Sequence, residues 1–240
     1  MSSGARRLLD SAELLVAMAL WGSLYPTSKL VLVRLSPFEV ALARASIAFL
    51  VLLALVLFRG MGRRMASELR HSAWPTASLG LLSFLFSSLL AMLSVRYLPA
   101  SVVGMITATS PLWLSLVAIA LHRPADSGRM LLGAGIALAG VGIILFKDGV
   151  ATVLAGQGLN PLGIFFALLC AIVIAMQAAW GRRVMPGRDS MVVTCLGCAW
   201  SIPPLVALGM AEGGLGDFLS LSLADAGIVL YLGIGCTALN

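Results

Sequence analysis

Residues 37–64 read PFEVALARASIAFLVLLALVLFRGMGRR, an almost unbroken apolar run from Pro37 to Phe58 with three arginines directly after it. A helix of about 20 apolar residues crosses the ~30 Å hydrocarbon core of a bilayer, so this run is long enough to span it. Arginines in the loop after such a run are typical of the cytoplasmic side. The stretch predicts a transmembrane helix, and similar runs recur along the chain.

Apolar runs cover most of the 240 residues. They lie at residues 12–33, 37–58, 73–96, 100–121, 130–146, 160–181, 190–210 and 226–240. Hydrophobic residues make up 60% of the chain and charged residues 11%, whereas about a quarter of residues are charged in soluble proteins. The runs do not alternate apolar and polar residues as the strands of a membrane barrel do. The sequence therefore predicts an all-α integral membrane protein, a multispanning helical bundle with about eight spans.

Basic residues are concentrated in alternate linkers between the runs. These linkers hold Arg59, Arg63, Arg64 and Arg70, then Arg123 and Arg129, then Arg182, Arg183 and Arg188. Cytoplasmic loops are enriched in Lys and Arg, so this pattern, with Arg6 and Arg7 before the first run, predicts a cytoplasmic N-terminus. The net charge of +6 reflects these loops, and no nucleic-acid partner is expected. A cleaved signal peptide is the less favoured alternative, because Asp10 and Glu13 interrupt its basic region and the apolar run is long.

Motifs of enzymatic or metal chemistry are absent from the sequence. There is no HExxH, GxSxG or phosphate-binding loop. Cys195 and Cys198 form a CxxC pair, but no second ligand pair or nearby histidine accompanies them. We therefore predict that the chain is not an enzyme and holds neither a cofactor nor a metal. The expected partners are a small-molecule substrate and the lipid bilayer.

Polar residues inside the first run are candidates for a binding site. Trp21, Tyr25 and Lys29 recur every four residues and so share one helix face. Pro26 has no N–H, which leaves the carbonyl of Gly22 without its intrahelical partner near the middle of the membrane. For the two aromatic residues, cavity lining and core packing both remain open. Lys29 lies nearer the outer end, where it is equally suited to reaching the membrane surface.

Arg44 is the sharpest candidate in the other runs. It lies about 10 Å along the second helix, and an arginine at the centre of a span costs ~2.5–3.5 kcal/mol, so it should face a wet cavity or a polar partner such as Glu39. Five further candidates are Ser87 on a stripe of small residues, Thr107 and Pro111 where proline interrupts the fourth run, and Gln177 and Trp180 near the end of the sixth. Interhelical packing or hydrogen bonding is the alternative for Ser87 and Gln177.

The linker between Lys147 and Pro161 divides the chain into five runs before it and two and most of a third after it. The stretch GLLSFLFSS from Gly80 is weakly similar to GIVLYLGIG from Gly227. Because five is an odd number, a second copy would enter the membrane from the opposite side, as in inverted-repeat transporters. We expect two repeats, 1–147 and 160–240, with the second incomplete. The last run reaches Asn240 before finishing a crossing, so we expect a chain truncated at its C-terminus.

Several short motifs together resemble the EamA-type proteins of the drug/metabolite transporter superfamily. They are ALWG at 19–22 with Lys29, RASIA at 44–48, RYLPAS at 96–101 and LGAGIALAGVGII at 132–144. The resemblance covers 12–146 and, more weakly, 160–240. It implies ten helices in two inverted five-helix repeats around a substrate cavity, and it singles out Trp21, Gly22, Lys29, Arg44 and Pro111. One departure is His122-Arg123, which stands where the family usually has an acidic residue.

The resemblance implies an inner-membrane permease that exports small metabolites, amino acids or drug-like solutes, by alternating access. The charges of Lys29 and Arg44 would favour solutes that carry a carboxylate. The alternatives are a non-transporting truncated fragment or partner subunit and, less favoured, an intramembrane enzyme. The substrate, the coupling ion and the oligomeric state do not follow from the sequence.

Overall fold

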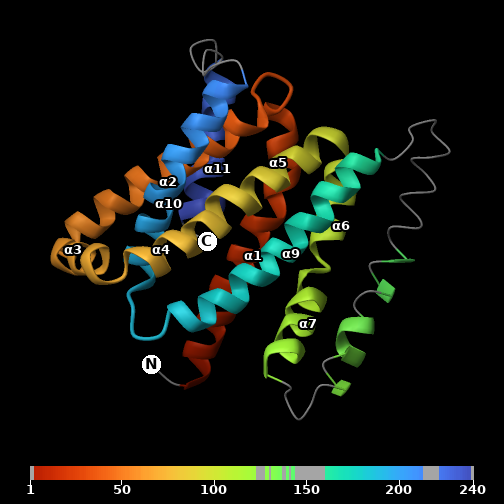
Figure 1. Cartoon of the computed structure of the whole chain (residues 1–240), viewed down its shortest axis with the longest axis horizontal. Coiled ribbons are helices and arrows are strands. Elements are labelled where there is room, and N and C mark those ends of the chain that lie inside the picture. The colour runs from red at the N-terminus through yellow and green to blue at the C-terminus, as the bar shows by residue number, and fades with distance from the viewer. Residues whose placement is uncertain are drawn as a thin grey trace.

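The apolar runs in the described part of the chain form helices, because a helix pairs the N–H and C=O groups of its own backbone and hydrocarbon offers no other partner. The computed structural model describes residues 3–122, 128, 129, 131–136, 139, 140, 142, 143, 160–212 and 222–238. Every regular element in this part of the chain is helical, which confirms the predicted all-α fold (Figure 1). The expected fifth run, 130–146, lies largely outside the described residues, and the linker 147–159 lies wholly outside them.

The helices follow the predicted runs closely. In chain order they are α1 (Ser3–Val31), α2 (Pro37–Phe58), α3 (Gly62–His71), α4 (Ala73–Gly80), η1 (Leu81–Ser87), α5 (Ser88–Tyr97), α6 (Ala100–Thr107), α7 (Ser110–His122), α9 (Pro161–Val184), α10 (Ser190–Ala211), α11 (Leu223–Gly233) and η3 (Ile234–Ala238).

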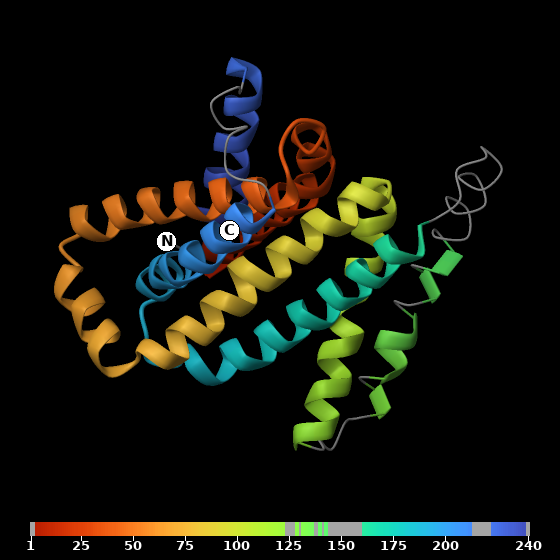
Figure 2. The same ribbon diagram turned by 45° about the horizontal axis from the view of Figure 1, so that its top comes forward.

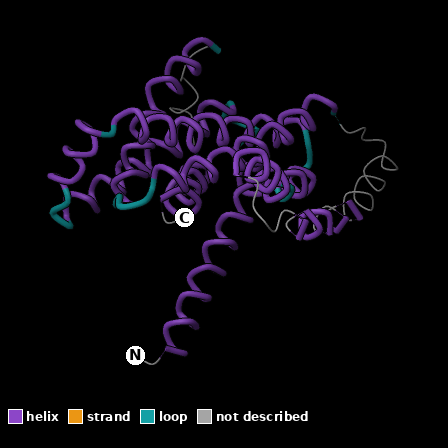
Figure 3. The backbone as a smooth tube through the Cα atoms, turned by 60° about the horizontal axis from the view of Figure 1, so that its bottom comes forward, coloured by secondary structure: helices purple, strands orange, loops and turns teal. Residues whose placement is uncertain are grey.

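Five stretches in the described residues are long and apolar enough to cross a bilayer. They are Pro37–Phe58, Ala73–Tyr97, Ala100–Ile119, Pro161–Val184 and Ser190–Ala211. A shorter apolar helix covers Leu223–Ala238. The helix α1 is not among the five, and its N-terminal part projects away from the bundle (Figure 3). The chain is therefore a multi-pass helical membrane protein, while its division into repeats remains a prediction.

Irregular backbone occurs at places that the prolines did not indicate. The helix α10 continues through Pro203 and Pro204, as α1 continues through Pro26. Proline removes one N–H but keeps a helical φ angle, so a packed helix can accommodate it. The irregular segments are instead η1 and η3, which are both π-helical. The fourth span does break one turn before Pro111, between α6 and α7.

The helix α3 lies in a linker for which the sequence predicted no helix. It is amphipathic, and the neighbouring side chains of Met61 and Met65 pack against the buried core of α2 and α10. Two ion pairs tie it to the start of α10: Arg188 to Glu68 at 2.9 Å and Arg64 to Asp189 at 3.5 Å. The helix thus lies at the end of the bundle that carries the arginine-rich loops, bound to the start of α10.

The remaining helices pack side by side around three clusters of buried apolar side chains. α2 lies along α10, and it also contacts α11 and η3. On the other side α5 runs next to α9 (Figure 2). Fully buried side chains such as Met92, Val95 and Leu232 fill the space between them.

Two helix crossings are so close that only glycine fits. A Cβ atom built on Gly80 would lie 2.3 Å from Cα of Gly197, so α4 and α10 touch backbone to backbone. A Cβ atom on Gly233 would lie 2.6 Å from the side chain of Ile47, where α11 crosses α2. Small residues allow such close approach between membrane helices. Each of these glycines is the last residue before a π-helical segment.

We predict that Gly80→Ala destabilises the fold by about 1–3 kcal/mol, the usual cost of overpacking a well-packed interior. The added methyl group would meet backbone atoms of Gly197, which have no rotamer to change. Gly227→Ala is the matched control, because a Cβ atom there has no neighbour within 4 Å. Thermal unfolding in detergent should show a lower Tm for Gly80→Ala alone. Equal Tm values for the two variants would contradict the backbone contact.

Candidate functional site

A cavity of about 930 Å³ lies between the helices that the close glycine crossings hold together. Its walls come from α1, α2, α4, η1, α5, α9, α10 and η3. From Arg44 and Cys236 it extends to Met185 and Asp189, which lie in the loop between α9 and α10. We call this end of the bundle the arginine-rich end, because it also carries Arg59, Arg63, Arg64, Arg182, Arg183 and Arg188. The end with the turns at 32–36 and 98–99 is the opposite end.

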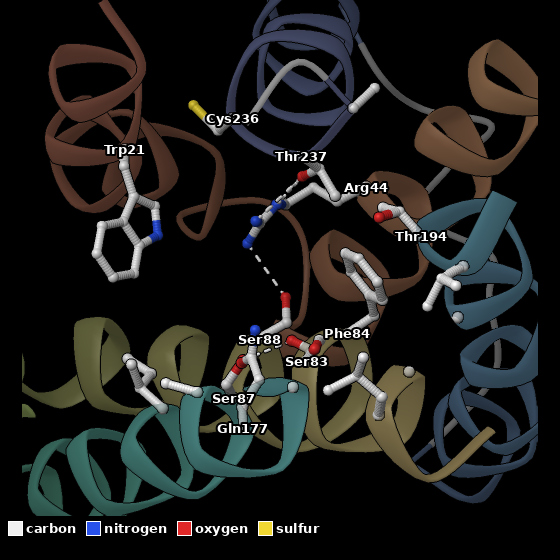
Figure 4. A pocket seen from close by; sticks show the side chains of 18 of the residues that line it. Trp21, Arg44, Ser83, Phe84, Ser87, Ser88, Gln177, Thr194, Cys236 and Thr237 are labelled. Atoms are coloured by element: carbon white, nitrogen blue, oxygen red, sulfur yellow. Dashed lines mark hydrogen bonds between the residues drawn. The ribbon is translucent and has the colours of Figure 1, made fainter. Parts of the chain in front are cut away.

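Arg44 lies at the inner limit of the cavity and is 6% exposed. Its NH1 atom donates to Oγ of Ser88 at 3.1 Å, and Nε and NH2 both donate to Oγ1 of Thr237, at 3.3 and 3.2 Å (Figure 4). Glu39, the partner that we considered from the sequence, is engaged elsewhere. Its carboxylate accepts the backbone N–H of Ser36, and the two residues form a capping box at the start of α2. Within the described residues, Arg44 is therefore held by hydroxyl groups and by no carboxylate.

The two π-helical segments supply much of the polar cavity wall. η1 contributes Ser83 and Ser87, and η3 contributes Cys236 and Thr237. The hydroxyl of Thr237 donates to the carbonyl of Leu232, five residues earlier, as the wider π turn allows. π-helical turns are often found at functional sites, because the extra residue re-aims the side chains that follow.

The π-helical segments also bear on the similarity between 80–88 and 227–235. The similarity aligns Gly80 with Gly227, whereas the tight crossing that precedes the second π-helical segment is at Gly233. The two structural features are therefore shifted by six residues relative to the sequence similarity, and the repeat remains a prediction. Four residues after Gly80 and Gly233, Phe84 and Thr237 both line the cavity (Figure 4).

Five of the ten residues singled out from the sequence line the cavity: Trp21, Tyr25, Arg44, Ser87 and Gln177. They come from four helices and face one space, as the cavity interpretation requires. Ser87 points its hydroxyl back to the carbonyl of Ser83, so its side chain is small and locally satisfied. The lining residues that the sequence did not single out include Phe84, Ser88, Thr194 and Thr237.

The other five lie outside the lining. Trp180 donates its indole N–H to Oγ of Ser78 at 2.9 Å and so joins α9 to α4. The hydroxyl of Thr107 donates to the carbonyl of Val103 in its own helix, although Thr107 lies next to the Tyr25 side chain. Gly22 and Pro111 are exposed in the chain as described. A substrate contact by any of these residues stays a prediction.

Lys29 is the fifth sequence-predicted residue outside the cavity lining, and it closes the opposite end of the bundle. Its ammonium group donates to the carbonyls of Val95 and Leu98, at 2.5 and 3.0 Å, and so caps the end of α5. Close by, Leu98 packs against Gly163, where a Cβ atom would come within 2.7 Å of it. These contacts fill the space between α1, α5 and α9 on this side, and none of the residues involved lines the cavity.

Two ion pairs lie at the same end. Arg34 contacts Asp225 at 2.7 Å, which joins the end of α1 to the start of α11, and Arg96 lies 4.0 Å from Glu212. The pKa of Asp225 is lowered, first by the hydrogen bond from the Ser222 hydroxyl and further by the nearby guanidinium of Arg34. The described structure is thus closed at the opposite end and open at the arginine-rich end.

A family model described as the EamA-like transporter family matches residues 13–146, more than half of the 240-residue chain. The match includes Trp21, Arg44 and the whole of η1, whereas Gln177 and Thr237 lie beyond it. No curated protein matches the chain significantly. Among the described residues, no group of three or more His, Cys, Asp or Glu side chains is placed to hold a metal ion.

The lowered pKa of Asp225 predicts that the free energy of unfolding depends on pH. A carboxyl group with a lower pKa in the folded than in the unfolded state stabilises the fold above the unfolded value, and this contribution is lost as the pH falls through the folded value. The ordinary value is 3.8, so we expect the Tm to fall as the pH decreases below about 4. In Asp225→Asn this fall should be smaller, because the group no longer titrates. Parallel Tm profiles of the two proteins in detergent would contradict the prediction.

Proposed function

Because the chain belongs to the EamA-like transporter family, it is a multi-pass membrane transporter of the drug/metabolite transporter superfamily, and we propose that it exports small metabolites from the cytoplasm by alternating access. Members of this family are transporters and not enzymes, and transport requires no covalent step. Amino acids and drug-like organic solutes are the proposed cargo classes, and the proposed location is the cell inner membrane.

The observation that carries the proposal is the asymmetry of the cavity. It reaches the arginine-rich end, and positively charged loops favour the cytoplasmic side of a membrane. The opposite end is closed by Lys29 and by the pair of Arg34 and Asp225. With the N-terminus in the cytoplasm, this is a conformation that accepts solute from inside the cell. An exporter loads its solute in this state, so the described conformation is compatible with the proposed export.

The closing contacts at the opposite end are of a kind that a transport cycle can break. Exposed ion pairs contribute only ~0–1 kcal/mol each, and Arg34 is 60% exposed at its side chain. The two hydrogen bonds of Lys29 to backbone carbonyls contribute more, about 1.5–3 kcal/mol each for a charged donor. Closed and open states that differ by a few kcal/mol are both populated enough to exchange. Opening of this end would pair with closure at the arginine-rich end, where α3 already contacts α10.

The transport route can be tested by filling the cavity. Ser87 lines it, so Ser87→Trp should block it and reduce solute efflux more than tenfold, whereas Phe86→Trp should leave efflux intact. Phe86 is the matched control, because it neighbours Ser87 on the same segment and is 48% exposed away from the cavity. The measurement is efflux of radiolabelled amino acids and organic acids from proteoliposomes that contain the 240-residue chain. Equal efflux from both variants, or none above empty liposomes in the unchanged protein, would contradict the proposal.

The proposed orientation predicts the side from which each end reacts. Ser190 lines the cavity at the arginine-rich end, and Val33 is 85% exposed at the opposite end. In a background in which the four native cysteines are replaced by alanine, Ser190→Cys should react with an impermeant maleimide only in inside-out vesicles. Val33→Cys should react only in right-side-out vesicles. The reverse pattern would place the N-terminus outside and make the described conformation open to the exterior.

A further inference from the structure

The inner part of the cavity contains a cation without a counter-ion among the described residues. Arg44 is buried and its three hydrogen bonds all go to hydroxyl oxygens. The carboxylate that lines the described cavity wall belongs to Asp189, at the mouth, where it caps α10 and pairs with Arg64. A buried charge is costly unless an opposite charge or strong hydrogen bonds compensate it. The hydroxyl groups orient Arg44 but do not neutralise it.

The hydrogen bonds of Arg44 leave two of its N–H donors free to bind a ligand. A guanidinium group has five N–H donors. Three of them are used by Ser88 and Thr237, one each on Nε, NH1 and NH2. One N–H therefore remains on each terminal nitrogen. Two N–H groups on one guanidinium match the two oxygens of a carboxylate, the bidentate arrangement that arginine forms most readily.

The rest of the inner cavity is suited to an apolar body. Trp21 lies across open space from Arg44, and Phe84 projects into the same space from η1 (Figure 4). Ile174 and Leu52 also line the cavity with apolar side chains. Aromatic rings favour stacked or edge-to-face contact with another ring. The polar groups of this inner part are mainly hydroxyls and the amide of Gln177. An ammonium group on a solute bound there would meet no carboxylate from the inner part of the described wall, because Asp189 lies at the mouth.

We propose that the cavity selects monocarboxylates with an apolar, preferably aromatic body. The carboxylate binds Arg44, and the body lies between Trp21 and Phe84. Ser88 and Thr237 are positioning residues, because they hold the guanidinium from α5 and from η3. Lys29 takes no part, since its ammonium group is bonded to backbone carbonyls outside the cavity. This substrate class rests on the proposed function, and it narrows the proposed cargo by disfavouring cations.

Equilibrium binding to the purified 240-residue protein in detergent tests the substrate class without requiring transport. The probes are radiolabelled 3-phenylpropionate and its uncharged amide, which have nearly the same shape. The unchanged protein should bind the acid at least tenfold more tightly than the amide. Arg44→Gln should weaken binding of the acid about 10- to 100-fold, the range expected for charge-assisted hydrogen bonds, and leave binding of the amide unchanged.

Two further variants separate the charge of Arg44 from its geometry and from net charge. Arg44→Lys keeps the charge but loses the planar fork, so binding of the acid should fall at least fivefold even though the cavity remains cationic. Arg96→Gln removes one positive charge at the opposite end, outside the cavity lining, and should keep the full preference for the acid. The Tm of each variant shows whether it is folded. Arg44→Lys carries the test if Arg44→Gln does not fold.

Three results would overturn the proposal: equal affinities for acid and amide in the unchanged protein, no binding of either probe, or loss of the preference in Lys29→Gln but not in Arg44→Gln. Failure of the proposed anion site can be distinguished from failure of the proposed export function. Efflux of solutes without a preference for carboxylates would leave export standing and remove the anion site. Arg44-dependent binding of the acid without any efflux would leave the site standing and remove export.

Discussion

A polar group in the hydrocarbon core of a membrane must find a partner within the protein, because an unpaired group there costs several kcal/mol. The described structure follows from this constraint. Backbone groups are paired by the helices themselves, and hydroxyl groups inside the spans often donate to a backbone carbonyl one turn earlier in their own helix, as Thr107 and Ser87 do. Even the ammonium group of Lys29 is absorbed in this way, at the carbonyls that α5 leaves unpaired at its end. The same constraint that forms the helices thus also closes one end of the bundle.

Arg44 is hydrogen-bonded within the described chain, but its positive charge is not balanced by a carboxylate there. Three hydroxyl contacts hold it, yet its counter-ion is supplied by no described residue. An anionic solute would supply the missing counter-charge when it binds. After the solute leaves, Arg44 keeps its hydrogen bonds to Ser88 and Thr237, so the empty site remains stable enough for release to occur. The π-helical segments matter here, since Thr237 reaches both Leu232 and Arg44 from the wider turn of η3.

How much of this could be predicted depends on whether a feature is local. Apolar runs are local, so the all-α membrane fold could be predicted, and an arginine within a run is costly wherever it points, so Arg44 could be singled out. Trp21, Tyr25, Ser87 and Gln177 also line the cavity, a placement that the sequence left open against packing between helices. Thr194 and Thr237 could not be found, because a threonine in a span carries no mark of its own. The partners of Lys29 are backbone carbonyls, which leave no trace in the sequence, and the π-helical segments arise where glycine crossings bring helices together.

The crossing of Gly80 and Gly197 has a mechanical consequence. Most helix contacts interlock side chains, and tilting one helix against another then requires many rotamers to change together. At this crossing the backbones of α4 and α10 touch directly, with no side chain between them. The contact offers little resistance to a change of angle but strong resistance to separation. It is therefore the point in the described bundle best suited to act as a pivot, and it lies in the wall of the cavity itself, where a change of angle between α4 and α10 would alter the shape of the cavity.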